Sequence, residues 1–392
     1  MFYCKPRKKL SSSAVKLEFN SEVYWMEDKS LPIYLTPKYL KALKESLPEN
    51  CKLILVRIIK GKELIAVGCF QEVLLDFKSI NSFGSLFSSE NRILILLERL
   101  IKNLLSNFKS KIRLLIIGNA QVSGPNGIWF KENVTESEKA FYWDLIIDKV
   151  EKKPKNPDVI IIKDLINSSV SVSETIKSNK FNEVKVLPVM NLKINPEWGL
   201  VSDYYKAFSS KYRIRAQRAR KKLIGINQIE LTIDDLTLIK KDIHILYNNV
   251  YNRARFRLLK ASDSYLFELK KNLKEDIIIN AYFKNEELIG FYSILKNKST
   301  IDAHLIGLNY DSNKNHALYL NMLYDITEVA INSKSKIIDF GRTAMEIKST
   351  VGAEPIEEKV FLKFNSTILN YISAYVLNKN SNELWTQRHP FR

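Results

Sequence analysis

The sequence predicts an α/β (α+β) protein of two tandem domains, each with a mixed, mainly antiparallel sheet flanked by helices. The chain has 392 residues, which is more than one ordinary hydrophobic core accommodates. Apolar segments with the length of strands alternate along it with segments of helical periodicity. A hairpin, a helix and an apolar strand ending at a glycine occur in that order in both halves. We therefore expect two domains of similar architecture.

The first domain is expected over residues 30–190, after a lead-in of residues 1–29 whose composition is typical of loose order. Its first helix extends to Ser46 and has a defined start, because Thr36 is a good N-cap and Pro37 suits the first helical position. The elements that follow are strands at Lys52–Ile59 and Leu64–Phe77, a helix at Asn91–Asn107, a strand at Ile112–Ile117, a helix at Ser137–Val150 and a strand at Asp158–Ile162.

The second domain is expected over residues 191–392 and contains a basic helix within residues 201–223. The segment Leu187–Trp198, which contains two prolines, is the expected crossover between the domains. The remaining elements are helices at Asp234–Asn252 and Ser262–Leu273, strands at Asp276–Phe283, Leu288–Leu295 and Thr300–Leu308, a helix at Asn315–Ser333, a strand ending at Gly341, a short helix, a strand at Lys359–Phe364 and a last helix.

The composition narrows the class of partner. The chain has 61 Lys and Arg against 43 Asp and Glu, and its formal charge of +18 favours phosphorylated cofactors, RNA or anionic membrane surfaces. Its three cysteines lack metal-ligand spacing, so we expect reduced thiols and no metal. No apolar run reaches the length of a membrane span, and no secretory signal follows the basic N-terminus. A cytoplasmic protein without a transmembrane segment is expected.

The segment Lys211–Lys222 carries seven basic residues and no acid. On a helix, Arg215 and Arg218 belong to a basic stripe that lies opposite an apolar, aromatic one. Like charges four residues apart destabilise a helix by about 0.2–0.5 kcal/mol per pair, so a bound anion would stabilise this one. Two interpretations stay open. The helix is either a solvated amphipathic helix or a binding track for phosphate or nucleic acid.

The segment Lys336–Pro355 contains the most informative cation of the chain. An apolar strand stops at Gly341, and the short helix that follows has Thr343 and Glu346 at the spacing of a capping box. Lys348 lies in that helix, and no acid is found three or four positions away. Its ammonium therefore either reaches water or binds an anionic ligand.

The chain resembles the GNAT superfamily of acyltransferases. More narrowly, it is similar to the tandem-domain, Fem-like acetyltransferases of the peptidoglycan-biosynthesis type. The segments that carry the resemblance are Ser209–Leu223 (SSKYRIRAQRARKKL), Asp276–Asn309 and Ala317–Pro355. The resemblance implies two GNAT-like domains, an acyl donor in a cleft of the C-terminal domain, and acyl transfer to a small-molecule or peptide amine.

Two donors stay open under this resemblance. The first is acetyl-CoA or another acyl-CoA, which GNAT proteins bind through a glycine-containing pyrophosphate loop. The corresponding segment here, Gly307–Lys314, lacks that glycine pattern, although Lys314 remains as a phosphate ligand. The second donor is aminoacyl-tRNA, which the Fem-type enzymes use and which would make tRNA a partner. A non-catalytic protein that binds nucleic acid or an anionic surface is the alternative outside enzymes.

The candidate catalytic residues lie on the strand Thr300–Leu308. His304 and Asp302 share one face of it, so His304 is a candidate base that Asp302 orients. A half-buried polar edge of the sheet is the alternative interpretation for this pair. The candidate substrate-binding residues are Asn321, Tyr319, Arg342 and Lys348, and the candidate cofactor-binding residues are Arg215, Arg218 and Lys314.

Overall fold

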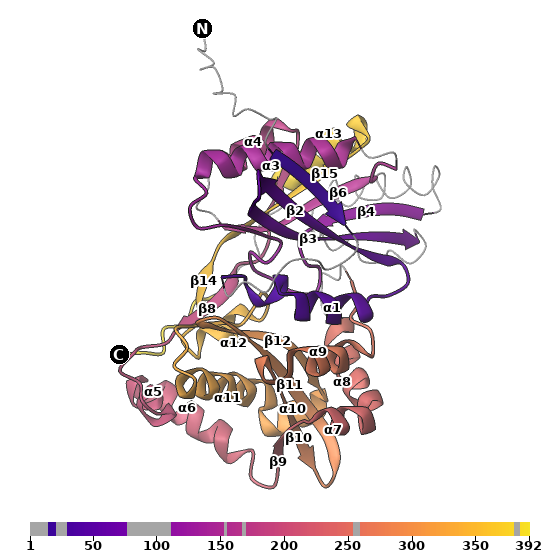
Figure 1. Ribbon diagram of the computed structural model, residues 1–392. Helices are drawn as coiled ribbons and strands as arrows, with labels where there is room; N and C mark the ends of the chain where they lie inside the picture. Colours follow the sequence, from indigo (N-terminus) through magenta and orange to yellow (C-terminus); the bar gives the residue numbers. More distant parts are fainter. Residues whose placement is uncertain are drawn as a thin grey trace.

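The computed structural model describes residues 15–20, 30–76, 111–152, 155–166, 170–253, 259–379 and 385–392. Within these residues the chain forms two sheets that lie one above the other, with helices on both (Figure 1). Each sheet contains a single parallel pair of strands, and all other neighbours are antiparallel. The predicted fold class is confirmed. The helix predicted at Asn91–Asn107 lies outside the described residues.

The first sheet has the strand order β1-β2-β3-β4-β6-β15-β7, and β5 pairs with β3. Helices α3 (Glu136–Glu151) and α4 (Val170–Ser178) cover one face of it, whereas α13 (Thr367–Lys379) packs with side chains of the other face. Its strands are β1 (Val15–Asn20), β2 (Cys51–Lys60), β3 (Glu63–Asp76), β4 (Lys111–Ile117), β5 (Ile128–Phe130), β6 (Val159–Ile166), β7 (Asn182–Val184) and β15 (Glu358–Phe364).

The second sheet has the order β14-β8-β13-β12-β11-β10-β9. Its strands are β8 (Val189–Lys193), β9 (Asn227–Glu230), β10 (Ile277–Lys284), β11 (Glu287–Asn297), β12 (Thr300–Leu308), β13 (Ile337–Asp339) and β14 (Glu354–Ile356). Three helices pack in one core with it: α5 (Val201–Ala207), α6 (Ser210–Lys221) and α11 (Leu318–Asn332). The helix predicted over Asp234–Asn252 is two helices, α7 (Ile233–Leu238) and α8 (Lys240–Arg253).

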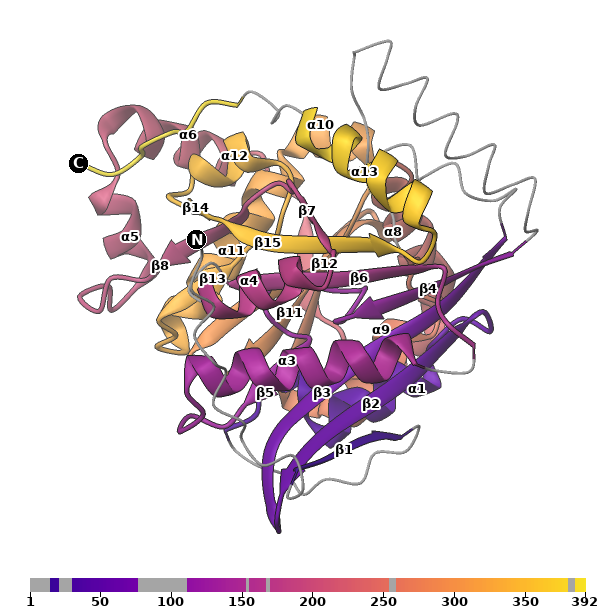
Figure 2. The same cartoon turned by 90° about the horizontal axis from the view of Figure 1, so that it is seen from above.

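The two sheets do not divide the chain at residue 190. Strand β8 lies in the second sheet although it begins before that point, and β15 with α13 returns to the first sheet. Figure 2 shows β15, in yellow, beside β6. The expected domain boundary at residue 190 is therefore corrected. The periodicity of a strand does not indicate which sheet the strand joins.

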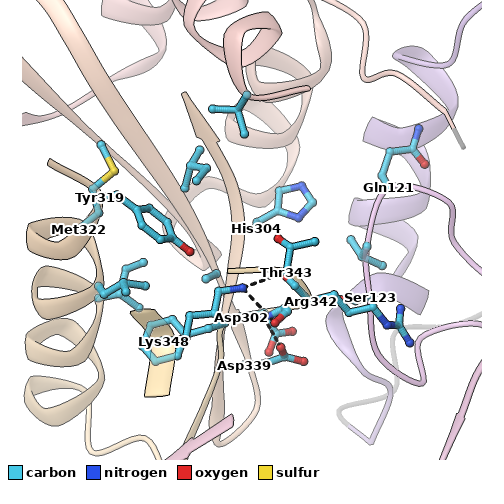
Figure 3. Close-up of a pocket in the computed structure, with 18 of the residues that line it drawn as sticks. Gln121, Ser123, Asp302, His304, Tyr319, Met322, Asp339, Arg342, Thr343 and Lys348 are labelled. Carbon is cyan, nitrogen blue, oxygen red and sulfur yellow. Dashed lines mark hydrogen bonds between the residues drawn. The ribbon is translucent and has the colours of Figure 1, made fainter. Parts of the chain in front are cut away.

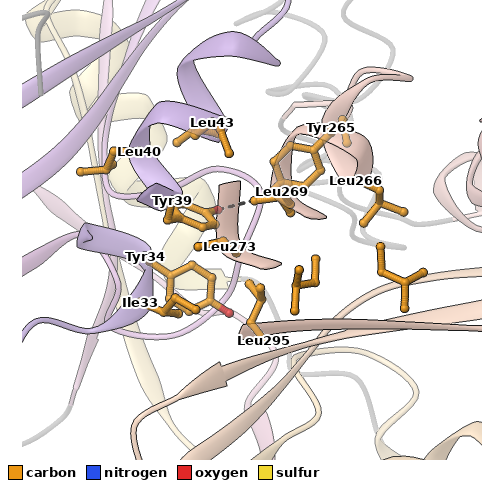
Figure 4. Packing of buried hydrophobic residues seen from close by; sticks show 14 of the residues in the cluster. Ile33, Tyr34, Tyr39, Leu40, Leu43, Tyr265, Leu266, Leu269, Leu273 and Leu295 are labelled. Carbon is orange, nitrogen blue, oxygen red and sulfur yellow. Dashed lines mark hydrogen bonds between the residues drawn. The ribbon is translucent and has the colours of Figure 1, made fainter. Parts of the chain in front are cut away.

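A continuous apolar cluster joins the two layers. It contains α1 (Pro37–Glu45) and the preceding 3-10 helix Ile33–Leu35, and these pack against α9 (Tyr265–Leu273) and strand residues of both sheets (Figure 4). The start of α1 is as predicted, since the Thr36 hydroxyl accepts the backbone N–H of Tyr39. The buried hydroxyls of Tyr39 and Tyr265 lie 3.0 Å apart. The layers therefore share one core and hold a fixed relation to each other.

The predicted capping box before Lys348 is absent. Helix α12 (Met345–Ser349) follows two residues with left-handed backbone, Thr343 (φ 66°) and Ala344 (φ 48°), and receives no side-chain cap. Glu346 instead forms an ion pair with Arg388 near the C-terminus. Left-handed backbone at a β-branched threonine is strained, and such strain is found most often at functional sites. Within the described residues, no helix is both long and apolar enough to cross a bilayer.

Candidate functional site

A cavity of about 230 Å³ opens where β12 and β13 separate. The two strands pair in parallel only from Thr300–Asp302 to Ile337–Asp339, and β12 then continues to Leu308 without that neighbour. The cavity is bordered by β12, by the turn between β13 and α12, by α11, and by first-domain residues 121–123 (Figure 3). Both layers of the molecule therefore contribute to it.

Two carboxylates lie opposite each other where the strands part. Asp302 and Asp339 are partners in the parallel register, and both border the cavity. Burial, followed by the charge of Asp339, raises the pKa of Asp302 to about 7. Burial likewise raises the pKa of Asp339 to about 6, although its Oδ1 accepts the backbone N–H of Gly341 at 2.7 Å. Two such carboxylates disfavour a double negative charge, so near neutral pH Asp302 is the one of the pair that more readily holds a proton.

Asp302 is also fixed by neutral partners. The side-chain amide of Asn297 donates to its Oδ2 at 2.9 Å, and the hydroxyl of Tyr34 forms a further hydrogen bond with its carboxylate. Tyr34 comes from the first domain, in the segment that enters the shared core. The position of this carboxylate thus depends on the packing of both layers.

Lys348 borders the cavity and is 3% exposed. Its Nζ donates to the backbone carbonyls of Gly341 at 3.0 Å and Arg342 at 2.7 Å, in the turn after β13. Burial lowers the pKa of its ammonium to about 7, and the charge of Asp339 opposes this shift. As the sequence showed, no acid lies three or four positions away, and the partners are main-chain oxygens. An ammonium has three donors, and these carbonyls accept two.

His304 also borders the cavity, with its ring close to the tyrosines that come from the shared core. Its Nε2 is buried and has no hydrogen-bond partner within the described residues. Burial lowers the pKa of the imidazole to about 3, so the ring is neutral at physiological pH. No hydrogen bond joins His304 to Asp302 in the described chain, since Asp302 bonds to Asn297 and Tyr34. The expected pair shares a strand face but does not interact as predicted.

Arg342 is held by protein carboxylates. Its Nη2 donates to Asp164 on β6 at 2.7 Å and to Glu358 on β15 at 2.6 Å, and its Nε donates to the carbonyl of Leu187 at 2.9 Å. Only the first sheet supplies these two carboxylates, which are almost fully buried. The guanidinium therefore links the first sheet to the turn that holds Lys348. Arg342 also lines the cavity, but the two carboxylates that it binds belong to the protein.

The two candidates on α11 lie differently. Tyr319 borders the cavity, and burial raises the pKa of its phenol. Asn321 is fully buried and does not line the cavity; its Nδ2 donates to the carbonyls of Ala219, His316 and Ala317 at 2.9–3.1 Å. Asn321 thus fastens α6 to the start of α11, which corrects its expected role in substrate binding.

The candidate cofactor-binding residues lie away from the cavity. Arg215 and Arg218 are exposed on α6, and Lys314 is exposed on α10 (Tyr310–His316). The turn after β12 is closed by its own side chain, since Asn309 Oδ1 accepts the backbone N–H groups of Asp311 and Ser312, both at 3.1 Å. The amides expected to meet a pyrophosphate are therefore already bonded.

Asp339 is the site residue that the sequence reasoning missed. It stands two residues before Gly341, at the end of an apolar strand, where open sheets tend to bind ligands. That position was a usable signal, but the parallel register that places it opposite Asp302 was not readable from the sequence. In the part of the chain that the structure describes, no group of three or more His, Cys, Asp or Glu could hold a metal ion.

Known proteins resemble this chain in structure but not in sequence. No family model matches the chain, and no curated protein sequence is similar to it at a significant level. Among solved structures, FemX is 10% identical, covers 86% of this chain and 93% of its own, and gives a TM-score of 0.51. A tandem GNAT protein from the clavulanic acid biosynthesis pathway is 8% identical over 83% of this chain and 87% of its own, with a TM-score of 0.46.

L-PGS from Bacillus licheniformis is 11% identical over 69% of this chain and 86% of its own, with a TM-score of 0.41. At these identities the similarity concerns only the fold. The TM-score of FemX, 0.51, is the one that supports it. The fold of this protein, two mixed sheets flanked by helices, is similar to that of FemX.

Proposed function

We propose that this protein transfers an acyl group from an activated donor to an amine, in the cavity between β12, β13 and α11. The observation that carries the proposal is the Asp302–Asp339 pair, which lies where the strands separate and has pKa values of about 7 and 6. An amine is mostly protonated at neutral pH, and it must lose a proton before its nitrogen can attack. A carboxylate whose pKa lies near the working pH is suited to accept that proton.

The proposed roles follow from the contacts. Asp302 and Asp339 attract the ammonium form of the acceptor, and Asp302 takes its proton. The amine nitrogen then bonds to the acyl carbon, and the bond from that carbon to the donor's sulfur or oxygen breaks. The proton that the nitrogen gives up on acylation passes to that sulfur or oxygen, which leaves as a thiol or a hydroxyl. Lys348 directs its remaining N–H at the developing oxyanion, where a preorganised donor is most effective. His304 is neutral and has a buried, unpartnered Nε2, so it hydrogen-bonds the substrate rather than acting as the base.

The size of the cavity limits the acyl group. Its wall on α11 is formed by Met322, Leu323 and Ile326 beside Tyr319. A closed apolar cavity of about 150 Å³ holds one benzene ring, so about 230 Å³ suits an acetyl or aminoacyl group together with the acceptor's amine. A long acyl chain would not fit inside it.

Two donors remain candidates. Acetyl-CoA or another acyl-CoA is the donor implied by the GNAT fold. Aminoacyl-tRNA is favoured by one observation, because Asn309 occupies the first-turn amides that would otherwise meet a CoA pyrophosphate. The exposed basic residues of α6 would suit a polyanionic donor equally well. Both donors occur in the cytoplasm, where we place the protein.

Calorimetry and a transfer assay test this proposal. Acetyl-CoA is titrated into the protein, and CoA thiol release is measured with a panel of primary amines. If acyl-CoA is the donor, binding is saturable, and Asp302→Asn abolishes release while the exposed control Asp311→Asn retains it. If aminoacyl-tRNA is the donor, charged tRNA binds with an affinity that falls steeply with salt, and its aminoacyl group is transferred. Absence of transfer from both donors would overturn the proposal and leave a binding protein.

A further inference from the structure

The first domain contains a second cavity, of about 260 Å³, at a position that corresponds to the first. The parallel pair of this sheet, β4 and β6, is matched from Leu114–Ile117 to Val159–Ile162, after which β4 ends. Residues 163–165 of β6 continue along the cavity wall, and Gly127 closes against Gly118. A Cβ at Gly127 would lie 2.8 Å from the Gly118 Cα, so this close approach requires glycine. None of the catalytic residues proposed above lines this cavity.

Two aromatic rings line it on the side of α3. Phe130 on β5 is half-buried, and Trp143 on α3 is 3% exposed. The ring of the neighbouring Trp129 points to the opposite face of the sheet and packs with the cluster between the layers. Phe130 is itself stacked on Tyr142, with ring centroids 6.2 Å apart, so its ring is held in place from behind. Aliphatic side chains of β4, β5 and α4 complete the apolar wall. A cavity of this size and composition suits a flat apolar group of about one ring.

The polar residues of the cavity carry both signs of charge. Lys139 Nζ lies 2.8 Å from Glu136 Oε1 on the first turns of α3, and Lys163 Nζ lies 2.7 Å from Asp164 Oδ2 on β6. These four charges sum to zero. A ligand with a single charge would leave one member of a pair unmatched, whereas a zwitterion would match both.

The two pairs differ in how firmly they are held. Lys163 also donates to the carbonyl of Val122, and Asp164 also accepts from Arg342. Both side chains therefore have additional hydrogen-bond partners within the protein. Glu136 and Lys139 are partly exposed and three residues apart on a helix, an arrangement that stabilises by only about 0.2–0.5 kcal/mol. The Glu136–Lys139 pair is therefore the one of the two that a ligand can open.

We propose that this cavity binds a free α-amino acid with an aromatic side chain. The ring lies against Phe130 and Trp143. The ligand's carboxylate binds Lys139 and its ammonium binds Glu136, so that each of these side chains exchanges one partner for another. This proposal concerns the first domain and holds whether or not the other cavity, which Asp302 borders, performs acyl transfer.

Calorimetry with L-phenylalanine tests the assignment, and tryptophan fluorescence gives a second readout because Trp143 contacts the ligand. Three analogues each lack one feature: 3-phenylpropionate lacks the ammonium, 2-phenylethylamine lacks the carboxylate, and L-alanine lacks the ring. We expect saturable binding of L-phenylalanine at millimolar concentration or below, and at least about tenfold weaker binding of each analogue.

Matched variants locate the site. Glu136→Gln and Lys139→Gln should each weaken L-phenylalanine binding by at least about fivefold. The pair Asp148–Lys152 at the other end of α3 is the control, with its atoms 2.7 Å apart, and Asp148→Asn or Lys152→Gln should bind as the wild type does. Asp302→Asn should also bind normally.

Three results would overturn the proposal. These are no saturation at millimolar L-phenylalanine, equal binding of 3-phenylpropionate, or loss of binding in Asp302→Asn but not in Lys139→Gln. The last result would place the amino acid in the cavity of the second domain.

Discussion

Replacement of Arg342 by methionine is the most direct test of how the two layers are held together. Methionine keeps much of the side-chain volume and removes the charge. In the native chain the guanidinium donates to Asp164 and Glu358, whose side chains are 1% and 4% exposed, and it is itself 18% exposed. The variant therefore leaves two buried carboxylates without their shared partner, although Asp164 retains Lys163.

Removing one member of a buried ion pair typically costs about 3–5 kcal/mol, and we expect a loss of unfolding free energy in this range at about pH 8. The loss should be smaller at about pH 5. Burial and the charge of Asp164 raise the pKa of Glu358 to about 7, so at the lower pH Glu358 is already protonated in the folded state and needs no counter-charge. Only Asp164 then loses a charged partner.

Urea unfolding followed by circular dichroism at the two pH values measures both losses. Arg388→Met is the matched control, because Arg388 pairs with Glu346 on the surface, and exposed pairs contribute at most about 1 kcal/mol. The reasoning is refuted if Arg342→Met costs no more than Arg388→Met. It is also refuted if the loss at about pH 5 equals that at about pH 8.

Three further substitutions probe the other assignments. Lys348→Met should abolish acyl transfer. The Lys348 ammonium has a pKa of about 7 in the folded protein against an ordinary 10.5, so the wild type gains unfolding free energy as pH rises between these values. The variant should lose this pH dependence. Urea unfolding at several pH values in that range measures it, and an unchanged dependence would contradict the assignment. Asn321→Leu removes three hydrogen bonds of a buried amide, although the carbonyls of Ala219 and Ala317 keep backbone donors. It should cost about 1–3 kcal/mol while the CoA or tRNA affinity is unchanged; a normal urea midpoint would contradict this. Reversal of Arg215 and Arg218 to glutamate should leave the melting temperature unchanged, because both are exposed, and should weaken tRNA binding; unaltered affinity in a filter-binding titration would remove α6 from the interface.

Local patterns predicted the elements well where one face of a segment had to be apolar. The hairpin β10–β11 and strand β12 were placed within about two residues, because strand periodicity and turn residues act over short distances. The start of α1 was also correct, since an N-cap bonds only to its own first turn. The same local reasoning failed at Glu346, whose partner Arg388 lies 42 residues away.

Five of the candidate residues border the cavity, namely His304, Asp302, Tyr319, Arg342 and Lys348, and their roles stay predictions. Strand alternation, and the lack of an acid three or four positions from Lys348, had singled out polar residues in an unusual environment. Asn321 was equally conspicuous in the sequence, yet its amide bonds to backbone carbonyls. A polar residue in an apolar helix indicates that its side chain has a hydrogen-bond partner. It does not indicate whether that partner belongs to the protein or to a ligand.

The sequence by itself determined the alternation of elements, the two-domain class and the basic, acid-free face of α6, because these depend on residues within a few turns of each other. The tertiary structure decided which carboxylates meet which cations. Asp339 faces Asp302 only through the parallel register of β12 and β13, and Arg342 reaches Asp164 across 178 residues of chain. Burial then sets the pKa of each group, and burial results from the packing of both layers, which no local pattern encodes.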